Sequence, residues 1–195
     1  MAGRPVGIID YLLASAQGIG NFLALYRTQG AGVHLSVEEI LAKSFMYGAI
    51  AGVASLWLMG VIYGRLGVRA GGKSTITQVI HVLAYGSVPL VASLAIWVLT
   101  ALLVGESTFV VTPGADLEGF LVLLLRVQFL AYVLMVIWSI VLQVMGFSEV
   151  QGLTTRKAFG VWVLGQIVGV LASLFLAVAI EALFPGALLS IIPQN

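Results

Sequence analysis

The best candidates for binding or chemistry in this sequence are the ionisable side chains within its long apolar stretches. Arg126 lies about nine residues into the apolar stretch 117–144, and a guanidinium near the centre of a bilayer costs about 2.5–3.5 kcal/mol on insertion scales. It must therefore pair, snorkel or face water. Glu181 is the carboxylate expected in the same half of the membrane, with Gln128 close by. Three interpretations follow: an Arg126–Glu181 bridge that fixes helix register, a site for an anionic lipid or substrate, and snorkelling alone.

A second candidate is the segment Gly67-Val-Arg-Ala-Gly-Gly-Lys-Ser74, which matches the phosphate-binding pattern GxxxxGK[ST]. That chemistry needs a strand before the loop, a helix after it, and an acidic residue on a second strand to help hold magnesium. Here an apolar helical stretch precedes the loop, and no strand–helix–strand pattern follows. The segment is therefore interpreted as a glycine turn, and a nucleotide is not an expected ligand. Three nearby basic residues are expected to contact anionic lipid head groups, at about 1 kcal/mol each: Arg65, Arg69 and Lys73.

Other kinds of chemistry find little support. Cysteine is absent, and the two histidines, His34 and His81, are too few for most histidine-built metal sites. No paired acid and base and no nucleophile motif stands out, so neither an enzyme nor a cofactor is predicted. Nine Lys and Arg residues against eight Asp and Glu leave no basic excess for nucleic acid.

The elements that must position these residues are apolar helices. Hydrophobic residues make up 61% of the 195 and charged residues 9%, whereas soluble domains carry about 25% charged residues. Crossing about 30 Å of hydrocarbon takes about 20 helical residues. Four stretches meet that length: 45–66, 79–104, 117–144 and 159–184. The prediction is an all-α, polytopic transmembrane helix bundle forming a single domain over 1–195.

A weaker stretch, 6–26, contains Asp10, Gln17 and Asn21. Each polar group would cost about 1–3 kcal/mol near the membrane centre unless neighbouring helices satisfied it. The stretch is a fifth span, an amphipathic helix lying in the interface, or a cleaved secretory signal. A fifth span is preferred, because four spans would require translocation of a basic N-terminal segment.

Local signals and charge give the helix starts and the orientation. Ser36-Val-Glu-Glu39 and Thr75-Ile-Thr-Gln78 are capping-box patterns, which predict helices from near Val37 and from the residues after Thr75. The loop 67–78 is basic, the next loop carries only acids, and the loop 146–158 contains Arg156 and Lys157. The positive-inside rule therefore places loops 67–78 and 146–158 in the cytoplasm.

Small residues recur at a spacing of four, which places them on one helix face and allows close packing in lipid. They predict contacts between helices, within or between chains: Gly48 and Gly52, Gly60 and Gly64, and Gly165 and Gly169.

Two segments together resemble a known family. Residues 75–90, TITQVIHVLAYGSVPL, lead into an apolar span, and residues 138–158 form a Trp-led helix that ends in GFSEVQGLTTRKA. This order is similar to that of the Yip domain family of Ypt/Rab-interacting membrane proteins, and it covers most of residues 44–184. Ala84 stands in place of the family's Gly, and the acidic entry motif of eukaryotic members is absent, so the chain resembles the prokaryotic branch. The matching positions are Tyr85, Pro89, Trp138, Gly152 and Lys157.

The resemblance implies a non-enzymatic, multi-pass protein of a prokaryotic cell membrane that acts as a scaffold for membrane protein partners or lipids. A protein partner or a homo-oligomer within the membrane is therefore expected, together with membrane lipids. The alternative hypothesis is a small transporter or channel subunit that uses Arg126 as an intramembrane polar site.

Overall fold

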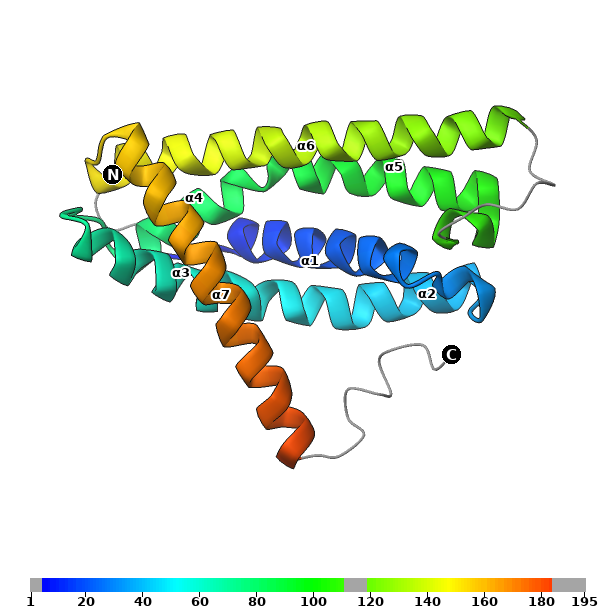
Figure 1. Ribbon diagram of the computed structural model, residues 1–195, viewed down its shortest axis with the longest axis horizontal. Helices are drawn as coiled ribbons and strands as arrows, with labels where there is room; N and C mark the ends of the chain where they lie inside the picture. Colours follow the sequence, from blue (N-terminus) through cyan, green and yellow to red (C-terminus); the bar gives the residue numbers. More distant parts are fainter. Residues whose placement is uncertain (1–4, 111–118, 184–195) are drawn as a thin grey trace.

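The computed structural model describes residues 5–110 and 119–183, and in these ranges every regular element is helical (Figure 1). In chain order the elements are α1 (Ile8–Thr28), the 3₁₀ turn η1 (Ala31–Val33), α2 (Val37–Lys43), the π turn η2 (Ser44–Gly48), α3 (Ala49–Arg69), α4 (Ile76–Gly86), α5 (Val88–Val104), the 3₁₀ turn η3 (Gly105–Phe109), α6 (Gly119–Gln151) and α7 (Thr155–Leu183).

Five helical segments of the described chain are long and apolar enough to cross a bilayer. They are Ile8–Thr28, Val37–Arg69, Ile76–Phe109, Gly119–Gln151 and Thr155–Leu176. The predicted all-α, multi-pass helical class is thus confirmed, and the weak stretch 6–26 forms a helix of spanning length. Residue 184 and the start of the predicted span 117–144 lie outside the described residues.

Two helices begin where the sequence predicted. The Ser36 side chain accepts a hydrogen bond from the Glu39 amide at 3.3 Å, and the Glu39 carboxylate accepts one from the Ser36 amide at 3.1 Å. Thr75 and Gln78 form the same reciprocal pair. Both capping boxes are confirmed, because each satisfies amide groups that the first helical turn leaves unpaired.

The helices α1, α3, α5 and α6 run side by side along the long axis of the molecule, whereas α7 crosses them steeply (Figure 1). We call the end at which residues 70–75 and 152–154 connect the helices the loop end. At the opposite end, α1 passes into η1, which contacts η3. The main contacts of α7 are with α3 and α6, and its second half exposes large apolar side chains such as Phe175 and Val178.

Glycines set the closest approaches between helices. A Cβ atom on Gly18 of α1 would overlap the Gly48 carbonyl oxygen and lie 2.7 Å from the Gly52 Cα, so α1 and α3 touch backbone to backbone. Gly60 and Gly64 of α3 face Ile80 and Ile76 of α4. Gly165 and Gly169 of α7 lie against Tyr63 and Met59 of α3.

Two elements differ from the sequence-based expectation. The predicted span 79–104 is interrupted at Ser87, where α4 ends and α5 begins with Pro89 in its first turn. In the predicted loop 146–158, the helix α6 continues to Gln151, so the connection itself is only 152–154. Gly146 does not end the helix. It packs closely against α4, since a Cβ atom at this position would lie 2.8 Å from the Val82 side chain. The chain turns instead at Gly152, whose φ of 63° suits glycine.

Candidate functional site

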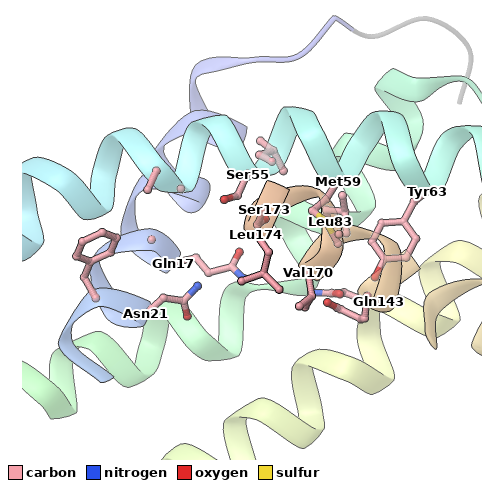
Figure 2. A pocket seen from close by; sticks show the side chains of 17 residues that line it. Gln17, Asn21, Ser55, Met59, Tyr63, Leu83, Gln143, Val170, Ser173 and Leu174 are labelled. Atoms are coloured by element: carbon pink, nitrogen blue, oxygen red, sulfur yellow. The ribbon is translucent and has the colours of Figure 1, made fainter. Parts of the chain in front are cut away.

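A groove of about 530 Å³ lies between α1, α3 and α7 (Figure 2). Its walls carry uncharged polar side chains from each of these helices and from α6. Figure 2 shows Gln17 and Asn21 extending from α1 into this space, with Ser55 on α3 and Ser173 on α7. The polar groups that we call the groove set are Gln17, Asn21, Ser55, Gln166 and Ser173.

The groove exists because α7 leaves the bundle after a tight contact with α3. The Tyr63 ring fills the space over Gly165, and its hydroxyl donates a hydrogen bond of 3.1 Å to the Trp162 carbonyl. The second half of α7 diverges from the rest of the bundle (Figure 1). Asn21, Ser55 and Ser173 are therefore exposed at the side of the molecule, at the level of the apolar spans.

The side chains of the groove set make no hydrogen bond to the described part of the chain. Gln143, at the groove floor, differs from them because its side chain is already hydrogen-bonded. There the Gln143 Oε1 atom accepts a 3.0 Å hydrogen bond from the Trp162 indole, and its Nε2 lies 3.5 Å from the Ser139 hydroxyl. Ser139 donates at 2.6 Å to the Gly86 carbonyl, one of the groups that the break before Pro89 leaves free. The floor is thus a closed network, whereas the groove set is available to an occupant.

A contact between the side chains of Asp10 and His81 holds α1 to α4 near the loop end. The Asp10 side chain is 3% exposed, and its carboxylate lies 2.8 Å from Nδ1 of His81. The other Asp10 oxygen accepts the Gly7 amide at 2.7 Å. Asp10, a costly residue for a spanning helix, is thereby satisfied by a neighbour.

The chemistry that the groove set offers is hydrogen bonding by amides and hydroxyls. Among the described residues, no group of three or more metal-ligating side chains comes together. The groove set offers amides and hydroxyls, which donate and accept hydrogen bonds but do not transfer protons readily near neutral pH. No protein family, curated protein or solved structure matches this chain.

Of the residues proposed for an intramembrane ion pair or ligand site, Arg126 and Gln128 point to different sides of α6. Arg126 is exposed on the surface of α6, whereas Gln128, two residues further, is 2% exposed and accepts a 3.2 Å hydrogen bond from Arg27 of α1. Residues two apart point to different sides of a helix, which explains the separation. The side chain of Glu181 lies outside the described residues. Arg27 is thus a functional candidate that the sequence reasoning missed.

The positions matching the family pattern are spread over the loop-end half of the bundle. Tyr85 and Trp138 are 47% and 64% exposed on the outer surfaces of α4 and α6, whereas Pro89 is buried. Gly152 forms the turn between α6 and α7, and Lys157 is exposed in the first turn of α7. None of them lines the groove.

The segment with the phosphate-binding pattern folds around a glutamine from α6. Gln151 is buried against Gly67 and Gly72, where any Cβ would overlap its side-chain amide. The Lys73 amide donates to the Gln151 carbonyl at 3.2 Å, and the Ser74 amide to its Oε1 at 3.4 Å. The amides of Lys73 and Ser74 are thus occupied by hydrogen bonds to Gln151. Arg65, Arg69 and Lys73 are exposed around it.

Proposed function

We propose that this protein is a non-enzymatic integral membrane scaffold of the Yip type that binds the transmembrane segment of a partner protein in the groove between α1, α3 and α7. The observation that carries the proposal is the groove set: five uncharged polar side chains from three helices that lack hydrogen-bond partners in the described chain. In hydrocarbon each such group gains from a partner, at about 0.6 kcal/mol and up to about 1.7 kcal/mol for an interhelical hydrogen bond.

The shape of the groove favours a helix over a small solute. Three residues of the groove set, Asn21, Ser55 and Ser173, are exposed, so an occupant can enter from the side, within the plane of the membrane. The rest of the wall is apolar and includes Met59, Val170 and Leu174. A partner helix with amide or hydroxyl side chains at mid-membrane depth matches both features, since it offers donors and acceptors on an apolar body.

The direct test is site-specific photo-crosslinking in native membranes. A photoreactive amino acid at Ser55 should give a covalent adduct with another membrane protein, which mass spectrometry identifies. The same probe at Leu134, a 57% exposed position on α6 outside the groove, is the matched control and should label lipid. An adduct between two copies of this chain would identify the partner as a second copy, and the protein as a homo-oligomer. Labelling of lipid alone at Ser55 would refute the proposal.

Substitutions at two glutamines that line the same groove distinguish an effect on binding from an effect on folding. Gln17→Leu should abolish the adduct and change the free energy of unfolding by less than about 0.5 kcal/mol, because the Gln17 side chain has no hydrogen bond to lose in the part of the chain that the structure describes. Gln143→Leu should destabilise the isolated chain by about 1–3 kcal/mol, because it leaves the Trp162 indole without an acceptor. A loss of stability from Gln17→Leu as large as that from Gln143→Leu would show that Gln17 is already paired.

A further inference from the structure

A second cavity lies at the end of the bundle opposite the loop end, where α1 approaches α5 and α6. Its volume is about 270 Å³. Arg27, in the last turn of α1, donates a 3.2 Å hydrogen bond to Gln128, and its guanidinium carbon lies 5.8 Å from the centroid of the Trp97 ring. The lining residues are Ala24, Arg27, Thr28, Trp97, Gln128, Phe129 and Tyr132.

The cavity contains a positive charge without a counter-ion from the described residues. The one close contact between an acidic and a basic side chain among these residues joins Asp10 to His81, near the other end of α1. A guanidinium has five N–H donors, and the Arg27 side chain donates a single hydrogen bond, to Gln128, among residues 5–110 and 119–183. The ring of Trp97 holds the cation in place and is itself packed against Phe109 and Tyr132.

Two further donors at this cavity are buried and unused. Within the described ranges, the Nε2 atom of Gln128 and the Nε1 atom of Trp97 have no hydrogen-bond partner, although these residues are only 2% and 4% exposed. A buried donor without an acceptor costs about 1–3 kcal/mol. A charge and two idle donors in one place are complementary to an anion with several acceptor oxygens.

We propose that this cavity binds a phosphate group, presented by the head group of an anionic phospholipid. Arg27 is the penultimate residue of the candidate span Ile8–Thr28, which places its guanidinium near the level where a bilayer's phosphates lie. A phosphate accepts two parallel hydrogen bonds from a guanidinium and retains oxygens for Gln128 and Trp97. Ala24 and Phe129 supply an apolar wall for the adjoining acyl chain. Arg126 lies two residues from Gln128 but points out of this cavity.

Lipid binding to the full-length chain tests the proposal. The delipidated protein in detergent is titrated with dioleoylphosphatidylglycerol and followed by native mass spectrometry, with dioleoylglycerol, which lacks the phosphate, as the matched lipid. Phosphatidylglycerol should bind saturably and at least about tenfold more tightly than dioleoylglycerol. Competition with inorganic phosphate identifies the source: weak displacement supports a lipid head group, and full displacement at low concentration supports free phosphate as the natural ligand. Equal binding of the two lipids would overturn the inference.

Variants locate the site. Arg27→Gln should weaken phosphatidylglycerol binding by at least about tenfold, and Trp97→Phe, which retains the ring but lacks the N–H, by about threefold to tenfold. Arg126→Gln removes the same charge outside the cavity and should have less than about a threefold effect. Arg27→Lys keeps the positive charge and should retain part of the affinity for phosphatidylglycerol. Retained binding would show that a loss in Arg27→Gln does not come from a folding defect. An equal loss from Arg27→Gln and Arg126→Gln would show general charge attraction and overturn the inference.

Discussion

The docking of α1 on α3 can be tested with a pair of glycine substitutions on the same helix. Gly18→Ala places a methyl group where it would overlap the Gly48 carbonyl oxygen and lie 2.7 Å from Gly52, both of which are backbone and cannot rotate away. Gly20→Ala adds the same methyl group at a position with no atom within 4 Å. Both variants gain about 0.8–1.0 kcal/mol of helix propensity, so the difference between them isolates the contact.

The expected magnitude follows from that contact. Overpacking a well-packed site costs about 1–3 kcal/mol, and a clash between two backbones should lie at the upper end because α1 and α3 must separate. Gly20→Ala should stabilise the chain slightly, and because the gain in helix propensity is common to both variants, they should differ by the overpacking cost alone, about 2–3 kcal/mol. The free energy of unfolding is measured in bicelles, by steric trapping or by a reversible denaturant titration. Equal unfolding free energies for the two variants would refute the α1–α3 packing, and with it one wall of the groove.

Three other contacts can be tested in the same way, by substituting the residues that form them. Asp10→Ala and His81→Ala should be non-additive in a double-mutant cycle, with a coupling of about 1–2 kcal/mol in the free energy of unfolding, because each removes the same 2.8 Å contact; additive losses would contradict it. Gln151→Ala should raise the hydrogen-exchange rate of the Ser74 amide by about tenfold, since that amide loses its acceptor; an unchanged rate would contradict the docked turn. Ser139→Ala should destabilise the bundle by about 0.5–1.5 kcal/mol by removing the donor to the carbonyl before the α4–α5 break, and a neutral result would mean that another group satisfies this carbonyl.

The features predicted from the sequence are those with a local cause. Helix class and approximate span follow from apolar length alone, and Ser36 and Thr75 begin helices because their caps involve residues only three positions away. Gly146 shows the limit of this reasoning, since whether a glycine ends a helix or packs within it depends on a neighbouring helix, here Val82 of α4.

The candidate sites depended on packing between distant segments. Arg27 and Gln128 are 101 residues apart, and Asp10 and His81 are 71 apart. No periodicity within one helix indicates such pairs. The groove is less predictable still, because it arises from the angle at which α7 leaves α3, and that angle is set by Tyr63 over Gly165. The presence of polar residues in the weak stretch 6–26 was the one signal available, and it indicated only that these groups needed partners.

The polar groups of the bundle fall into two physical classes, and this division underlies both proposals. Asp10 with His81, and Ser139 with Gln143 and Trp162, are paired within the chain, so their removal leaves a buried partner unsatisfied and must reduce stability. The groove set and the idle donors beside Arg27 contribute no hydrogen bond of this kind to the isolated chain. Because lipid tails cannot satisfy them, their free energy improves only when a ligand binds. Substitutions at these positions should therefore change what the protein binds more than how stably it folds.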